Sequence, residues 1–257
     1  MEWRHQIPLA EKGVIVGCDR RQEWILTWWW KHYTKHNTFP VTFVDWGLSE
    51  EAKEWCHQRG NLSFLEMKDF QWKEREALDP ALVAIWEKGY GTGFWASRKS
   101  WFYKPFALLH TPYEKTLWLD VDCQVKDNLS VLFDKRAVAL CPLPDYDKEY
   151  SLTYYRREFE MEHRLILPNE VIFNTGVLLY AHKNPLILQW AREVLPRAQH
   201  FLGDQNLLSR IIFENHYTIE PLPQIYNWYL GCGHNPEAKI IHFIGDLAKE
   251  FIWHEVY

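Results

Sequence analysis

Two aspartates separated by a single residue, near the middle of the chain, offer the clearest chemistry in the sequence. Asp120 and Asp122 follow an apolar run, residues 117–119, that has the bias of a buried strand. Because side chains alternate along a strand, both carboxylates point to one side, with Cα atoms about 7 Å apart, and Val121 points to the other. Two anionic oxygen donors can share one hard divalent cation, whereas the alternative is a strand end with two solvated acids.

Cations must lie near these carboxylates if the strand end is buried, because burying unpaired carboxylates costs a large free energy. Residues 97–109, which we predict to be a helix running into the strand, supply Arg98, Lys99 and Lys104. In one interpretation Arg98 or Lys104 points into the cleft beside the two acids. In the other, the three cations form a solvated basic face.

Further polar groups occur at the ends of predicted strands or interrupt them. Asp19 follows the first strand, Asn174, Thr175 and Gly176 interrupt a later one, and His242 lies on the last. Ligands of parallel sheets bind beyond the carboxyl ends of the strands, so we expect one cleft to hold Asp19, the Asp-x-Asp motif and His242. The glycine at 176 indicates a close approach of a ligand or of backbone. Asp19 either caps the following helix or contacts a nucleoside. His242 alone would be a core histidine, but the Asp-x-Asp motif favours a metal ligand.

Composition narrows the function classes. The chain has 257 residues, a formal charge of −5, a sequence pI near 6.2 and 47% hydrophobic residues. An acidic chain without a basic run is not expected to bind nucleic acid by neutralising phosphates. The five cysteines are scattered and no apolar stretch is long enough to span a bilayer, so we expect a cytoplasmic protein. Its aromatic N-terminal helix and a Tyr-rich segment are surfaces that a membrane or a partner could touch.

Strands alternate with helices in the first half of the chain, which predicts an α/β fold with a mixed, mostly parallel sheet flanked by helices. We expect one domain over residues 1–257, with an acceptor-side insert at 143–168 that has no clean periodicity. Asp204 opens a predicted helix and is interpreted as its N-cap. Strands are predicted at 13–18, 41–44, 62–65, 117–121, 137–141, 171–180 and 240–243, and helices at 20–37, 49–59, 79–89, 97–109, 184–195 and 203–213.

Seven short motifs in this order resemble those of nucleotide-diphospho-sugar glycosyltransferases of the GT-A fold, nearest to glycosyltransferase family 8 and its glycogenin-like members. They are GVIVGCD, WFYKPFALL, LWLDVDCQV, FNTGVLLY, GDQNLL, LPQIYN and IIHFIGDLAK, and they extend over residues 13–249. The resemblance implies a single GT-A (Rossmann-like) domain. It also implies transfer of a sugar, of hexosyl type and with retention, from a UDP-linked donor to a glycan, lipid-linked or protein acceptor.

The resemblance implies that Asp120, Asp122 and His242 hold the metal. Two carboxylates, one imidazole and diphosphate oxygens form an oxygen-rich site that suits Mn²⁺ or Mg²⁺, and the imidazole favours Mn²⁺. Cys232 and His234 with the same histidine would be an alternative zinc site, but no fourth ligand has suitable spacing.

The remaining roles also follow from the resemblance. Lys249 matches the phosphate-binding lysine, although one extra residue precedes it, so that Arg98 or Lys104 could replace it. Asn174 and Gln205 match residues that contact the transferred sugar, and Asp204 is the candidate to steady positive charge on the ring or to form a transient adduct. The expected donor-binding residues are Asp19, Arg98, Lys104, Asp120, Val121, Asn174, Thr175, Gly176, Gly245 and Lys249.

Two other functions fit parts of the pattern. A sugar-phosphate nucleotidyltransferase shares the broad architecture, but it carries a glycine-rich loop after the first strand, where this chain has CDRRQEW. A non-catalytic carbohydrate-binding protein would explain the 15 tryptophans, which are flat platforms for sugars. It would not explain a complete set of metal ligands.

Overall fold

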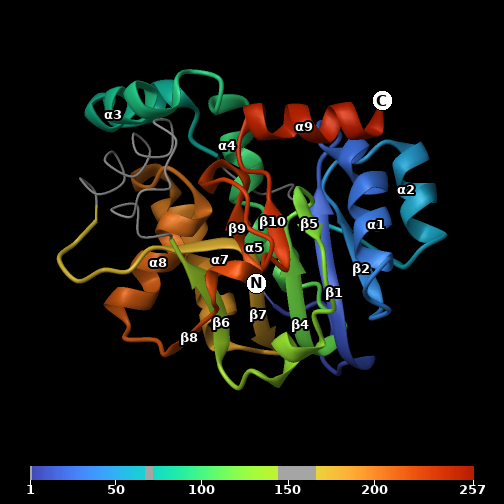
Figure 1. The fold of residues 1–257 in the computed structure, drawn as a ribbon. Coiled ribbons are helices and arrows are strands. Elements are labelled where there is room, and N and C mark those ends of the chain that lie inside the picture. Colours follow the sequence, from blue (N-terminus) through green and yellow to red (C-terminus); the bar gives the residue numbers. More distant parts are fainter. Residues whose placement is uncertain (1, 67–71, 144–165) are drawn as a thin grey trace.

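A mixed seven-stranded sheet in the order β3-β2-β1-β4-β7-β6-β8 forms the centre of the molecule (Figure 1). The computed structural model describes residues 2–66, 72–143 and 166–257. Strands β3, β2, β1 and β4 run parallel, β7 is antiparallel to both neighbours, and β6 and β8 are parallel. The predicted α/β class with a mostly parallel sheet is confirmed. The strands of this sheet are β1 (Ala10–Cys18), β2 (Val41–Asp45), β3 (Asn61–Phe64), β4 (Tyr113–Leu119), β6 (Val138–Pro142), β7 (Phe173–Ala181) and β8 (Ile219–Pro221).

Both faces of the sheet are covered by helices, because the central strands are apolar on both sides. In β1, Val14 and Val16 belong to one buried cluster and Ile15 to the other, and Trp118 of β4 likewise faces away from Leu117. Helices α1, α2 and α9 cover the first face, and α5, α7 and α8 cover the second. The helices are α1 (Leu26–Thr34), α2 (Glu50–His57), α3 (Pro80–Tyr90), α4 (Trp95–Trp101), α5 (Lys104–Leu108), α7 (Pro185–Arg197), α8 (Asp204–Glu214) and α9 (Asp246–Val256).

A second, three-stranded sheet joins two segments that lie far apart in the sequence. Its order is β5 (Cys123–Val125), β10 (Ile240–His242) and β9 (Trp228–Tyr229). The antiparallel register of β5 and β10 pairs His242 with Cys123, and the N–H of Phe243 donates to the carbonyl of Asp122 at 3.0 Å. Backbone hydrogen bonds alone therefore place His242 beside the Asp-x-Asp motif.

Several boundaries differ from the sequence-based expectations. The strand that precedes the acids ends at Leu119, so Asp120 and Asp122 occupy a turn closed by the bond from Cys123 N–H to the Asp120 carbonyl. The helix predicted at 97–109 is two helices, α4 and α5. The break lies at Phe102 and Tyr103, between the two helices. Pro105 has no N–H and cannot donate to the carbonyl of Trp101, so the helical hydrogen bonds of α4 do not continue into α5.

The expected helix cap at Asp19 is wrong. The first helical turn begins at Glu23, and Gln22 precedes it without a side-chain cap. The Asp19 carboxylate instead accepts a hydrogen bond from the backbone N–H of Arg21 at 2.9 Å and pairs with its guanidinium at 3.0 Å. The local bond to Arg21 closes a turn after β1, which explains why the helix starts later than predicted.

Arg98 is a structural cation and does not face the cleft, contrary to the prediction for donor binding. Its guanidinium is 1% exposed and donates to the carbonyls of Ala198, Phe201 and Leu202 at 2.6, 2.7 and 3.0 Å. Burial lowers its pKa to about 10, so it is charged at neutral pH. It thereby ties α4 to the segment between α7 and α8. The aromatic rings around it belong to Trp72, Trp86, Trp95 and Phe102.

Among the described residues, no helix is both long and apolar enough to cross a bilayer. The predicted insert at 143–168 lies largely outside the described residues, which include only its ends, Leu143 and 166–168.

We expect Arg98→Leu to lower the free energy of unfolding by at least about 2 kcal/mol, because three buried carbonyls lose their donor. Urea denaturation followed by circular dichroism measures this change. Arg75→Leu is the matched control: its ion pair with Glu87 is solvent-exposed, so the unfolding midpoint should hardly move. Equal midpoints for the two variants would show that Arg98 does not hold these elements together.

Candidate active site

A cleft of about 570 Å³ opens at the end of the central sheet. Strand ends supply part of its wall through Gly17 of β1, Trp46 after β2 and Asp120 after β4, as expected for a mostly parallel sheet. The start of α8 and the start of α9 supply the opposite side, and Figure 1 shows α9 across the top of the molecule, near the end of β1. The predicted residues that line it are Lys104, Asp120, Val121, Asp122, Asn174, Thr175, Asp204, Gln205, His242, Gly245 and Lys249.

The two acids and the imidazole converge in this cleft. The Nε2 atom of His242 lies 3.2 Å from Oδ1 of Asp122 and 3.8 Å from Oδ2 of Asp120. With bonds of about 2.1–2.2 Å, neighbouring octahedral ligands lie about 3.0 Å apart, so the Asp122 distance is close to that separation and the Asp120 distance is longer. The three side chains are at least mostly buried, with the Asp120 side chain 22% exposed and the other two at most 10%. Two carboxylates and one imidazole are donors that suit one hard divalent cation, and of the three side chains Asp122 and His242 lie closest together.

Two lysines balance the charge of the acids. Lys104 contacts Asp120 at 2.9 Å, and Lys249 contacts Asp122 at 2.9 Å. Lys249 therefore reaches the site despite the extra residue before it. The indole N–H of Trp118 also donates to Asp120 Oδ1 at 2.7 Å, so that this carboxylate is held in one orientation.

Burial and pairing act in opposite directions on these groups. Burial alone would raise the pKa of Asp122, but the ammonium of Lys249 and the imidazole of His242 outweigh it, and its pKa lies well below the ordinary value. Burial alone would lower the pKa of Lys104, but Asp120 and Asp204 outweigh it, and its pKa is raised. Asp122 and Lys104 are therefore ionised at neutral pH.

Cys123 also lies near the acids, since its sulfur falls with ligand atoms of Asp122 and His242 within 4.8 Å of one another. Its Sγ faces the carbonyl of Gly176 at 3.7 Å, and it is fully buried. Burial first, and then the nearby aspartates, raise its pKa well above the ordinary value, so it is a thiol and not a thiolate. The oxygen donors, which face the cleft, are better ligands for a hard ion.

Asp204 is not the N-cap of α8, contrary to the prediction. The cap position is Gly203, and Asp204 is the first helical residue. Its carboxylate accepts from the hydroxyl of Thr175 at 2.8 Å and lies 3.4 Å from the ammonium of Lys104. Burial raises its pKa, and Lys104 opposes the rise. Thr175 and Lys104, which are distant in the sequence, contact the Asp204 carboxylate, and it does not cap the helix.

Position 176 must be glycine because the imidazole of His242 packs directly against it. A Cβ at this position would overlap the ring of His242 and would lie 2.9 Å from Oδ1 of Asn174. Asn174 also donates from Nδ2 to Oε1 of Gln205 at 2.9 Å. The two residues expected to contact a sugar are thus bonded to each other at the floor of the cleft.

Sequence reasoning missed several residues of the site. Asn227 lies in a segment interpreted only as a loop, yet it is fully buried and contacts both Asn174 and His242. The motif LPQIYN was the signal available, but no role was assigned within it. Asp19 does not line the cleft. Its partners Arg21 and Ser100 do, so Asp19 positions the rim.

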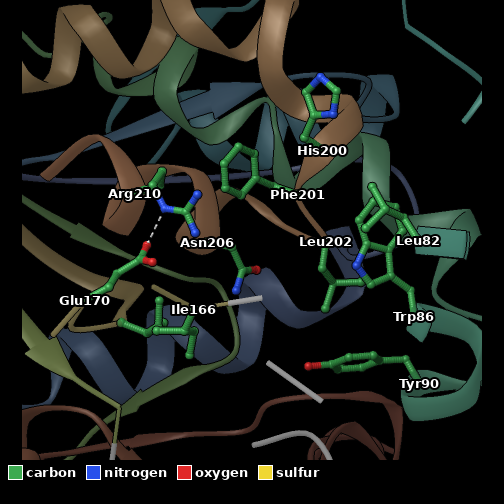
Figure 2. A pocket seen from close by; sticks show the side chains of 11 residues that line it. Leu82, Trp86, Tyr90, Ile166, Glu170, His200, Phe201, Leu202, Asn206 and Arg210 are labelled. Atoms are coloured by element: carbon green, nitrogen blue, oxygen red, sulfur yellow. Dashed lines mark hydrogen bonds and ion pairs between the residues drawn. The ribbon is translucent and has the colours of Figure 1, made fainter. Parts of the chain in front are cut away.

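A smaller cavity of about 280 Å³ adjoins the cleft and shares Tyr90, Leu202 and Asn206 with it (Figure 2). Its remaining wall is aromatic and aliphatic, apart from the ion pair between Glu170 and Arg210 at 2.9 Å. The other residues that line it are Leu82, Trp86, Ile166, Ile172, His200 and Phe201.

Solved structures that resemble this fold are glycosyltransferases, whereas no protein-family model and no curated protein matches the sequence. The bifunctional glycosyltransferase WbbM is 14% identical with a TM-score of 0.59, and the match covers 94% of this chain and 47% of WbbM. GlyE of Streptococcus pneumoniae TIGR4 is 16% identical with a TM-score of 0.59, covering 96% of this chain and 60% of GlyE. The galactosyltransferase LgtC with donor and acceptor sugar analogs is 14% identical with a TM-score of 0.52, covering 91% and 87%.

This chain spans about half the length of WbbM and most of the length of LgtC. At these identities the likeness concerns the fold.

We expect Gly176→Ala to destabilise the protein by about 1–3 kcal/mol, because the new methyl group overlaps a buried ring. The control is Gly93→Ala in the same cleft, where no atom lies within 4 Å of the added Cβ. Urea unfolding of both variants gives the comparison. A Gly176→Ala protein as stable as Gly93→Ala would contradict the tight packing of His242 on this glycine.

Proposed function

We propose that this chain, which has the GT-A fold, is a metal-dependent glycosyltransferase that moves a sugar from a nucleotide-sugar donor to an acceptor hydroxyl. The observation that carries the proposal is the convergence of Asp120, Asp122 and His242 in the cleft at the end of the sheet. The fold of known glycosyltransferases supports the same reaction class. We further propose that the donor is UDP-linked, that the ion is Mn²⁺, and that the enzyme belongs with the glycogenin-like transferases of family 8.

Asp120, Asp122 and His242 would hold the ion, since a site of two carboxylates and one imidazole accepts Mn²⁺ as well as Mg²⁺. When bound, a divalent ion supplies positive charge that stabilises the negative charge developing on the departing diphosphate. Lys104 and Lys249 line the same cleft and extend this positive field. Their ammonium groups are positioned by the acids before a donor arrives, which lowers the reorganisation needed during the reaction.

The sugar would lie over the floor made by Asn174 and Gln205, whose amide groups can hydrogen-bond its hydroxyls. Asp204 lies at the same end of the cleft, and Lys104 holds it near the acids. We assign to Asp204 the stabilisation of positive charge on the sugar ring, or a transient adduct, in a reaction with retention. The anomeric configuration of the product, read by proton NMR from the first turnover, distinguishes retention from inversion.

The acceptor would occupy the smaller cavity that adjoins the cleft. Tyr90 stands at its junction with the donor side, and Trp86 and Phe201 supply aromatic surface (Figure 2). Aromatic faces bind the apolar faces of sugar rings, and the Glu170–Arg210 pair offers polar contacts at the far end. A glycan, whether free, lipid-linked or attached to a protein, fits this combination.

We expect calorimetry to detect UDP binding that depends on Mn²⁺, because an ion held by the three ligands would supply the positive charge that attracts the diphosphate. Titrations of UDP with Mn²⁺ and with a chelator make the comparison. Binding of a free sugar without nucleotide would favour a carbohydrate-binding protein instead. Turnover of a nucleoside triphosphate with a sugar phosphate would favour a nucleotidyltransferase.

We expect Asp122→Asn to lower the rate of nucleotide-sugar turnover by at least about 100-fold, equivalent to roughly 2.7 kcal/mol in the barrier. Released nucleoside diphosphate is the readout, first with a screen of nucleotide sugars and both ions. Asp127→Asn serves as the control, because this acid lies on the surface in an ion pair with Lys239. Undiminished turnover by Asp122→Asn, or by the unaltered protein in chelator, would contradict the proposed metal dependence.

A further inference from the structure

One backbone N–H sets the orientation of a chain of buried side chains that ends at His242. The N–H of Gly176 lies 2.8 Å from the side chain of Asn174. A peptide N–H can only donate, so the Asn174 atom that faces it must be the amide oxygen and not the amide nitrogen. This assignment does not depend on any choice between the two amide orientations, which are otherwise hard to tell apart.

The orientation of Asn227 follows from that of Asn174. The side chain of Asn227 contacts the same Asn174 oxygen at 2.7 Å. Because that oxygen accepts, Asn227 must offer its amino group there, and its own Oδ1 therefore points the other way. This Oδ1 lies 2.9 Å from Nδ1 of His242, and Asn227 is fully buried. A buried oxygen in this position needs a donor, so Nδ1 of His242 carries a proton.

Protonation of Nδ1 leaves Nε2 as the ring nitrogen that can offer a lone pair to a cation. Nε2 is also the nitrogen that faces Asp122 and Asp120. Gly176 supports the same arrangement twice more: it lacks a Cβ where the imidazole packs, and its carbonyl accepts from the Asp120 N–H at 2.8 Å. The ligands are thus oriented by a common set of backbone and amide groups.

We propose that Asn227 is a positioning residue that holds His242 in the Nδ1–H tautomer, so that Nε2 is presented to a divalent cation. The proposal rests on the proposed function in that the bound group is a metal ion. Asn227 acts through His242 and does not itself line the cleft. Partners of this kind orient a metal-binding histidine and raise its basicity, and their loss weakens metal affinity by about 10–100-fold.

The tautomer is measurable in the unaltered, metal-free protein. In a ¹⁵N-labelled sample, a long-range ¹H–¹⁵N correlation spectrum separates protonated from unprotonated ring nitrogens. A His242→Gln sample identifies the signals among the 12 histidines. We expect a protonated Nδ1 for His242. An unprotonated Nδ1 would overturn the proposal, whether or not any variant folds.

The affinity of the protein for Mn²⁺ provides a second test of the role of Asn227. We expect Asn227→Leu to bind Mn²⁺ about 10–100-fold more weakly than the unaltered protein, measured by electron paramagnetic resonance of free Mn²⁺ without donor. The matched control is Asn37→Leu, because Asn37 is also buried and makes two hydrogen bonds, to Asp127 and Leu129, away from the cleft. It should lose stability but retain Mn²⁺ affinity.

The outcomes separate the two proposals. A folded Asn227→Leu protein with unchanged Mn²⁺ affinity would overturn the role of Asn227, even if turnover requires the metal. An unaltered protein that binds no Mn²⁺ would contradict the proposed function, while the ring nitrogen signals would still decide the tautomer. Equal losses of affinity in Asn227→Leu and Asn37→Leu would show a general effect of lost stability and would also overturn the positioning role.

Discussion

The charges of Asp120 and Asp122, two aspartates in one mostly buried turn, constrain the rest of the structure. Two carboxylates can stay ionised there only with positive charge close by, because their desolvation is otherwise too costly. Lys104 from α5 supplies that charge at 2.9 Å from Asp120, and Lys249 from α9 supplies it at 2.9 Å from Asp122. The elements that carry these lysines are therefore drawn to the end of the central sheet, and the cleft forms between them.

The pairing of strands β5 and β10 brings the imidazole of His242 to the site. The β5–β10 register places His242 beside Cys123, and the paired strands belong to a small sheet packed on one face of the large one. The described residues of the site thus lie on strands, at helix starts and in the short turn after β4. Rigid supports of this kind keep charged groups in place without a further cost of reorganisation.

Much of the fold was predictable because its signals are local. Continuous apolar runs such as residues 14–16 mark strands buried on both faces, and Asn184 and Asp79 cap their helices as side chains of that type usually do. The convergence of Asp120, Asp122 and His242 was predictable because polar groups at strand ends gather at one edge of a mostly parallel sheet.

Other roles depend on distant partners that no local pattern reveals. Arg98 and Lys104 are both cations of the same predicted helix, yet the break before Pro105 sends one into the core and the other into the cleft. Asp19 and Asp204 both looked like helix caps, but Arg21 and Thr175 hold their carboxylates elsewhere.

A crystal of the protein with UDP and Mn²⁺, measured at the manganese absorption edge, tests the central claim most directly. The account predicts one anomalous peak within about 2.0–2.4 Å of Nε2 of His242 and of an oxygen from each of Asp120 and Asp122. A peak away from these atoms, or a nucleotide bound there without any peak, would contradict it.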